Sequence, residues 1–152
     1  VQGGYNAWNA AGLPSLKPKV LSASEKKRFS RHFRIPEVQE SGQLKLKSTS
    51  VLVIGSGGLG CPSLLYLAAA GIGRLTIVDN DVVDESNLQR QVLYTEEDVG
   101  KNKVDAARAR LHKLNKNVQI EILNLRIDDQ NIEDLVQSHD IILDRTDNFD
   151  TR

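Results

Sequence analysis

A glycine-rich turn at residues 55–60 is the segment of this sequence whose residue types most directly suggest a chemistry. Its glycines are Gly55, Gly57, Gly58 and Gly60, and it separates a short β-branched apolar run from a longer apolar stretch. Glycines allow a backbone to approach a pyrophosphate, and the free amide groups and dipole of a following helix supply positive potential. The turn therefore predicts a bound nucleotide; a ligand-free turn between a strand and a helix is the alternative.

Asp79 stands about 20 residues after the glycine turn, which is the spacing of the ribose-binding acid in dinucleotide folds. An acidic side chain there accepts hydrogen bonds from ribose hydroxyls, so Asp79 fits any adenine nucleotide, NAD included. Capping of the following loop is the alternative role, and Asp81 could take either one.

Three polar and basic residues indicate which kind of nucleotide binds. They are Asn87, Arg90 and Lys103. The pyrophosphate of a dinucleotide is largely satisfied by backbone amides, whereas a triphosphate carries more charge, and guanidinium and ammonium groups suit phosphate oxygens. The group favours a triphosphate, unless Arg90 and Lys103 are solvated surface charges.

Thr146, Asp147 and Asn148 follow the last predicted strand. They should emerge at the carboxyl edge of the sheet, where open α/β folds bind ligands. A carboxylate at this edge can hold Mg²⁺, with waters and phosphate oxygens completing the shell. Asp147 is therefore the candidate metal ligand, and capping of a helix is its alternative role.

The elements that must position these residues alternate between strands and helices. Short apolar runs indicate strands, and longer apolar or amphipathic stretches indicate helices. Strands are predicted at 50–54, 75–78, 118–123 and 140–144, and helices at 59–70, 103–114 and 131–138. This alternation predicts an α/β, Rossmann-like fold with a mainly parallel sheet and helices on both faces.

Three segments are expected along the chain. Residues 1–19 are rich in small and turn-forming residues and are interpreted as a tail or linker. Residues 20–49 form an N-terminal helical extension, which begins at a capping box made by Ser22 and Glu25. Residues 50–152 are the nucleotide-binding half of a domain that we expect to be truncated at its C-terminal side, because no closing element follows the last strand.

The composition narrows the class of protein. The 152 residues carry 20 basic and 20 acidic side chains, so no net field favours nucleic acid or an anionic membrane. The single cysteine, Cys61, excludes an internal disulfide and a multi-cysteine metal site in this segment. No apolar run reaches the roughly 18 residues of a membrane span. We therefore expect a cytoplasmic enzyme whose partners are neither nucleic acid nor membrane.

Six motifs occur in the order and context of the ubiquitin-activating superfamily, which this sequence resembles over residues 21–152. The resemblance is closest to the superfamily's bacterial branch, the molybdopterin-synthase and thiamine-biosynthesis adenylyltransferases. The motifs are residues 28–31 (Arg-Phe-Ser-Arg), 55–61 (Gly-Ser-Gly-Gly-Leu-Gly-Cys), Asp79, 86–91 (Ser-Asn-Leu-Gln-Arg-Gln), 99–103 (Val-Gly-Lys-Asn-Lys) and 146–148 (Thr-Asp-Asn).

The resemblance implies ATP-dependent adenylation of the C-terminal glycine of a small ubiquitin-like sulfur-carrier protein, for cofactor biosynthesis or thiolation. By matching position, Asp79 would bind the ribose and Asp147 the Mg²⁺. Asn87, Arg90 and Lys103 would bind the phosphates together with the glycine turn. Since the family works as a homodimer, Arg31 would reach the ATP of the neighbouring subunit. The catalytic residues would then be Arg31, Arg90, Lys103 and Asp147.

Arg145 departs from the family pattern, which has a small or uncharged residue before Thr-Asp-Asn. It could add a phosphate contact or disturb the metal position. The family's zinc-binding cysteine pairs and acceptor cysteine do not occur in this segment, so zinc is expected only in a missing C-terminal part.

Residues 1–14 resemble the C-terminal end of a rhodanese domain, a sulfurtransferase module that carries persulfide sulfur and would act as sulfur donor. Two other functions are kept as alternatives. An NAD-dependent oxidoreductase accounts for the glycine turn and Asp79 but leaves Arg90 and Lys103 unused. A nucleotide-binding module without catalysis is the second.

Overall fold

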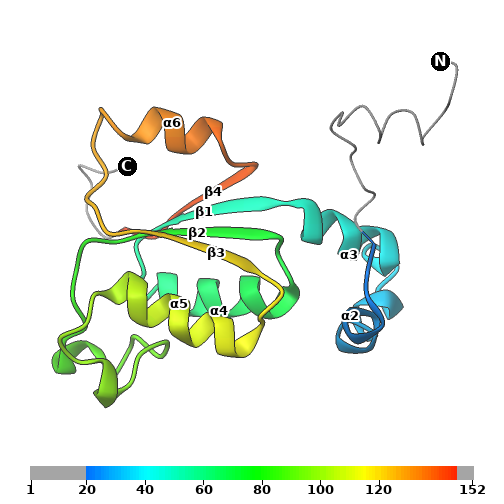
Figure 1. Ribbon diagram of the computed structural model, residues 1–152, viewed down its shortest axis with the longest axis horizontal. Coiled ribbons are helices and arrows are strands. Elements are labelled where there is room, and N and C mark those ends of the chain that lie inside the picture. Colours follow the sequence, from blue (N-terminus) through cyan, green and yellow to red (C-terminus); the bar gives the residue numbers. More distant parts are fainter. Residues whose placement is uncertain (1–19, 147–152) are drawn as a thin grey trace, which may run out of the picture.

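The computed structural model describes residues 20–146, which form a parallel β-sheet with helices packed against it (Figure 1). The strands are β1 (Ser50–Ile54), β2 (Arg74–Val78), β3 (Gln119–Leu123) and β4 (Ile141–Asp144), in the order β3-β2-β1-β4. Each neighbouring pair is parallel. The predicted α/β fold is therefore confirmed. No helix in residues 20–146 is long and apolar enough to cross a membrane.

The two central strands, β1 and β2, are buried because apolar residues cover both of their faces. Val51 and Val53 of β1 belong to one hydrophobic cluster, whereas Leu52 and Ile54 belong to another on the opposite face. Strands buried on both sides appear as continuous apolar runs, which is why β1 could be placed from the sequence with its observed bounds.

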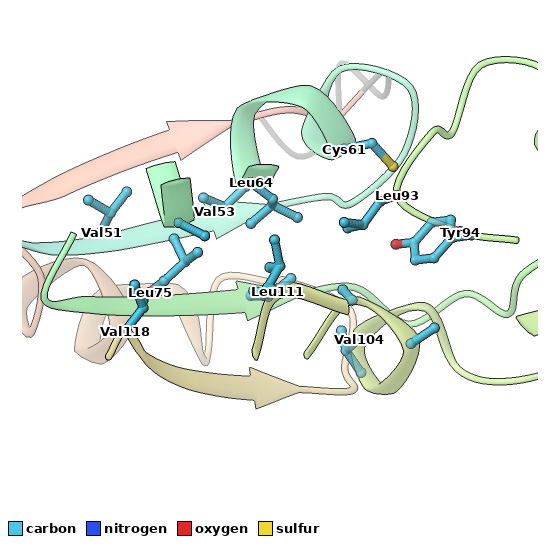
Figure 2. Close-up of a cluster of buried hydrophobic side chains, with 14 of the residues drawn as sticks. Val51, Val53, Cys61, Leu64, Leu75, Leu93, Tyr94, Val104, Leu111 and Val118 are labelled. Carbon is cyan, nitrogen blue, oxygen red and sulfur yellow. The ribbon is translucent and has the colours of Figure 1, made fainter. Parts of the chain in front are cut away.

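Helices cover both faces of the sheet, as predicted. α4 (Gly60–Ala70) and α5 (Lys103–Leu114) lie on one side, and α6 (Ile132–Gln137) lies on the other (Figure 1). Leu64 of α4 and Leu111 of α5 are fully buried in the larger cluster (Figure 2). Ile132 and Leu135 of α6 pack against the smaller cluster on the other face.

The connection between β2 and α5 contains two short 3₁₀ helices, η2 (Glu85–Asn87) and η3 (Glu96–Asp98), which no sequence pattern had predicted. Their brevity removes the periodic signal on which helix prediction depends. The connection is nevertheless well packed, because Val83, Leu93 and Tyr94 are buried in the larger cluster. It can therefore hold side chains in fixed positions beside the sheet.

The helical extension consists of α2 (Ala23–Arg28), the 3₁₀ helix η1 (His32–Arg34) and α3 (Gln39–Ser48), and it lies beside the amino ends of the strands (Figure 1). The predicted capping box is present, with Ser22 and Glu25 each accepting the other's backbone amide. Buried Gln43 of α3 donates to the Ala70 carbonyl at the end of α4. This contact attaches the extension to the sheet domain.

Glu25 joins α2 to α3 through Lys47. Its carboxylate lies 2.7 Å from Lys47 Nζ and accepts the Ser22 amide at 2.8 Å. Burial raises the pKa of Glu25, but hydrogen bonds from Lys47 and Ser22 outweigh burial and leave the pKa below 4.5. The ionised carboxylate therefore stabilises the fold above pH 4.5, and this stabilisation is lost as pH falls through the lowered pKa.

Glu25→Gln should lower the free energy of unfolding by about 1–3 kcal/mol at neutral pH, since it removes the buried charge that Lys47 faces. Urea denaturation should show this difference shrinking below pH 4.5, where the wild-type carboxylate also becomes protonated. Glu37→Gln, at an exposed position of the same segment, is the control and should have little effect. A loss for Glu25→Gln that is the same at both pH values would contradict the assigned charge effect.

Candidate functional site

A cleft of about 420 Å³ opens at the carboxyl ends of the strands. Its wall includes the glycine turn after β1, residues 79–81 after β2, residues 125–127 after β3, Arg145 and Thr146 after β4, and Arg90 and Gln91 from the connection between β2 and α5. In open α/β sheets, ligands bind in this crevice where the strand order reverses, which here is next to β1. The fold thus brings the predicted turn and the ends of all four strands to one site.

Two glycines of the turn have no room for a side chain. Gly55 has a φ of 90°, and a Cβ there would lie 3.0 Å from the Arg145 carbonyl oxygen. A Cβ on Gly60 would lie 2.1 Å from the Gly55 carbonyl oxygen. Gly57 and Gly58 border the cleft without such close backbone contacts. The outer glycines therefore close the turn, and the inner two leave its backbone accessible to a ligand.

Asp79 lies on the cleft wall and is held by the turn itself. Its Oδ2 accepts the Ser56 amide at 2.7 Å and the Ser56 hydroxyl at 2.8 Å, and its Oδ1 accepts the Asp81 amide at 2.9 Å. A carboxylate has about four lone-pair sites, so these bonds leave capacity for a ligand hydroxyl. The orientation of Asp79 is thus set before any ligand arrives.

Tyr94 holds Ser56 from the other side. Its hydroxyl donates to the Ser56 carbonyl oxygen at 2.9 Å and to Ser56 Oγ at 2.8 Å. Figure 2 shows Tyr94 at the end of the buried cluster, next to Leu93. Burial raises the pKa of Tyr94 well above its ordinary value, so the hydroxyl stays a neutral donor. Neither Ser56 nor Tyr94 was singled out from the sequence, because contacts over 38 positions leave no local pattern.

Cys61, the first residue after the turn, has a structural role. It is buried, and its Sγ donates to the Ser56 carbonyl oxygen at 3.1 Å. Burial raises its pKa, which disfavours the nucleophilic thiolate.

Arg90 borders the cleft, whereas Asn87 is not part of the described wall. The Arg90 guanidinium donates to Asn87 Oδ1 at 2.7 Å. Asn87 therefore orients the arginine in this structure and does not itself face the cleft.

Lys103 is buried behind the wall. Its Nζ donates to Asp81 Oδ2 at 2.9 Å, and it is Asp81 that borders the cleft. Arg31 is exposed in the segment between α2 and η1, and it is not among the residues that line the cleft. The fold therefore does not bring the side chains of Lys103 and Arg31 to the cleft of their own chain.

Asp147, the predicted Mg²⁺ ligand, lies outside the described residues, as does Asn148. Within residues 20–146, no group of three or more histidine, cysteine, aspartate or glutamate side chains could hold a metal ion.

Arg126 and Arg145 add positive charge to the cleft. A phosphate contact was one of the two roles expected for Arg145, whereas Arg126 was not predicted. With Arg90 they make three arginines among the lining residues, against the two aspartates Asp79 and Asp81. This excess of positive charge suits an anionic ligand. A single arginine after a strand carries no periodic signal, so Arg126 could not have been found without the fold.

Two polar atoms of the wall lack a partner. Gln91 Oε1 and Arg145 Nε are buried and have no hydrogen-bond partner among the described residues. Buried polar atoms in folded proteins are almost always hydrogen-bonded, so two orphaned atoms in one cleft indicate that a ligand or ordered water completes it.

The comparisons place the chain among known proteins. The profile of the ThiF family matches residues 29–152. "Probable adenylyltransferase/sulfurtransferase MoeZ" of Mycobacterium tuberculosis is 51% identical over 140 residues, covering 91% of this chain and 36% of MoeZ. The SAMP-activating enzyme E1 of Haloferax volcanii is 46% identical over 132 residues, covering 87% of this chain and 49% of that protein.

A solved structure of E. coli MccB with AMPCPP and MccA is 37% identical, with a TM-score of 0.67, over 76% of this chain and 36% of that chain. The chain thus spans less than half the length of each of these three proteins. The matches confirm the resemblance that the six sequence motifs indicated.

Tyr94→Phe should lower the free energy of unfolding by about 1 kcal/mol, because it removes the hydroxyl that donates to both Ser56 oxygens. Tyr66→Phe is the matched control, since Tyr66 lies on α4 with 77% exposure. Urea denaturation of both variants measures the difference. Equal stability of the two variants would show that the Tyr94 hydroxyl does not support the turn.

Proposed function

Because the chain belongs to the ThiF family, we propose that it binds ATP in the cleft and adenylates the C-terminal glycine of a small ubiquitin-like sulfur-carrier protein. The observation that carries this proposal is the accessible backbone of the glycine turn with Arg90 beside it on the same wall. MoeZ is named an adenylyltransferase, the Haloferax protein is named an activating enzyme, and MccB is seen with AMPCPP, a methylene analogue of ATP.

In the proposed reaction, a carboxylate oxygen of the acceptor's terminal glycine attacks the α-phosphorus of ATP. The new P–O bond forms as the bond to the bridging oxygen breaks, pyrophosphate leaves with the electron pair, and an acyl adenylate remains. Both reacting groups are anionic, so catalysis depends on cations and positioning more than on a general base. The three arginines of the cleft wall meet this requirement.

The contacts in and behind the cleft wall support roles for Asp79, the glycine turn, Arg90 and Lys103. Asp79, oriented by Ser56, would accept the ribose hydroxyls. The amides of the inner turn and of Gly60, at the start of α4, would hold phosphate oxygens. Arg90, oriented by Asn87, would neutralise the phosphates that leave. Lys103 would reach a phosphate by exchanging its bond to Asp81 for one to a phosphate oxygen.

The family resemblance assigns roles to Asp147, Arg31 and the segments of the chain. Asp147 would hold Mg²⁺, which neutralises phosphate charge when bound. Arg31 is exposed and does not line the cleft of its own chain, so it would act on the ATP of a second copy in a homodimer. Residues 20–49 and 50–152 would be the helical extension and the nucleotide-binding part of one adenylating domain, with residues 1–19 as a rhodanese remnant and linker that precedes it.

An NAD-dependent oxidoreductase is the alternative that the glycine turn and Asp79 also fit. Three arginines on the wall exceed what a dinucleotide pyrophosphate needs, because backbone amides largely satisfy it. The charge of the cleft therefore favours a bound triphosphate over NAD. It also favours adenylyl transfer over hydride transfer and over nucleotide binding without catalysis.

Exchange of radiolabelled pyrophosphate into ATP tests the proposed reaction. We expect exchange with the wild-type protein only when a small ubiquitin-like protein ending in Gly-Gly is present. Arg90→Ala should lower the exchange rate by roughly 100-fold or more, as removal of a group that stabilises transition-state charge does. Its folding should be unchanged, because Arg90 is exposed.

Arg108→Ala is the control for this variant, since Arg108 is an exposed arginine on α5 that pairs with Asp105, away from the cleft. It should exchange at the wild-type rate. An undiminished rate in Arg90→Ala would remove Arg90 from the site. Absence of exchange in the wild type, together with binding of NAD, would replace adenylation by the oxidoreductase alternative.

A further inference from the structure

We propose that Arg145 binds the α-phosphate of the nucleotide, the phosphate that is retained in the acyl adenylate. The inference rests on the proposed function, because it assigns a contact inside the same cleft. Arg145 stands where the family pattern has a small or uncharged residue, and we assign this arginine a role in binding the nucleotide.

The backbone of Arg145 is packed against the glycine turn. Its amide donates to the Ile54 carbonyl oxygen at 2.8 Å. Its carbonyl oxygen lies so close to Gly55 that a Cβ there would be 3.0 Å away, and a Cβ on Gly60 would be 3.9 Å from the Arg145 Cβ. The arginine side chain therefore starts beside the first turn of α4.

The amide of Gly60, the first residue of α4, is open to an anion, because the N-cap residue Leu59 makes no side-chain capping bond. The next two positions offer nothing, since the Cys61 amide donates to the Gly57 carbonyl oxygen at 2.8 Å and Pro62 has no amide hydrogen. A phosphate at the Gly60 amide would lie beside Arg145, whose Cβ would be 3.9 Å from a Cβ on Gly60. The guanidinium and the helix terminus would then act on the same anion.

Arg145 lacks an acceptor that a phosphate would supply. Its Nε is buried and has no partner within residues 20–146. Neither carboxylate of the wall accepts Arg145 Nε: Asp79 accepts two bonds from Ser56, and Asp81 accepts Lys103 Nζ. A guanidinium has five donors and no acceptor, so a phosphate oxygen is the complementary group.

Contacts at the base of the glycine turn assign Arg145 to the α-phosphate. Asp79 is bonded to Ser56, and the Arg145 carbonyl oxygen would lie 3.0 Å from a Cβ on the neighbouring Gly55. With the ribose held at Asp79, the phosphate attached to it lies nearest to this base. Arg90 approaches the turn at Gly58, where a Cβ would lie 3.5 Å from Arg90 Cδ, so the outer phosphates are left to Arg90.

Calorimetric titration of the protein with adenosine, AMP and ATP tests the assignment. Arg145→Ala should weaken the binding of both AMP and ATP by roughly 10- to 100-fold, the effect of losing a charged hydrogen bond. Adenosine, which has no phosphate, should bind with unchanged affinity. Arg145→Lys should give an intermediate loss, since a point charge replaces the guanidinium fork. Arg110→Ala, an exposed arginine on α5, should match the wild type.

Each other outcome overturns the assignment. Unchanged AMP affinity in Arg145→Ala, whether or not ATP binding falls, would mean that Arg145 does not contact the α-phosphate. An equal loss for adenosine, with an unchanged Tm, would make Arg145 a part of the wall and not a phosphate ligand. If Arg145→Ala does not fold, unchanged AMP binding by Arg145→Lys is the decisive negative result. A wild type that binds no nucleotide would instead overturn the proposed function itself, and this inference with it.

Discussion

The close approach between Gly60 and the Gly55 carbonyl oxygen is the constraint on which the rest of the site depends. A Cβ at Gly60 would be 2.1 Å from that oxygen. The chain can therefore turn from β1 into α4 in this conformation only if residue 60 has no side chain. The tight turn places the amino end of α4 at the carboxyl edge of the sheet. It also buries Ser56, whose amide and hydroxyl then meet Asp79 at the end of β2.

The connection between β2 and α5 supports the turn although it contains little regular structure. Leu93 and Tyr94 are buried in the cluster under α4 and α5, and the Tyr94 hydroxyl contacts Ser56. The same connection carries Arg90 and Gln91 to the cleft wall. The packing of this connection therefore links the hydrophobic core to the polar site. Burial of Leu93 and Tyr94 fixes the positions from which Arg90 and Gln91 border the cleft.

The polar residues of the site fall into two groups: those bonded to other protein groups, and those with a buried atom that has no hydrogen-bond partner. Asp79, Asp81 and Lys103 are bonded to other protein groups and form a scaffold. The buried atoms without partners, Gln91 Oε1 and Arg145 Nε among the described residues, border the cleft. Their convergence on one cleft agrees with a polar ligand: an anion would accept from Arg145 Nε, and a hydrogen-bond donor of the ligand or a water would satisfy Gln91 Oε1.

The sequence by itself determined the strands, the longer helices of the sheet domain and the turn. An apolar run predicted β1 at 50–54 and an amphipathic pattern predicted α5 at 103–114, both with their observed bounds, and the glycines predicted a strand-to-helix turn, because these signals lie within a few neighbouring residues. Asp79 could be placed near the turn because parallel strands end at the same edge. Only the tertiary structure decided that Tyr94 holds Ser56, that Lys103 faces Asp81, and that Arg126 and Arg145 share the wall with Arg90. These contacts join residues that are distant in the chain, and no periodicity in the sequence records which side chains will meet once the core has formed.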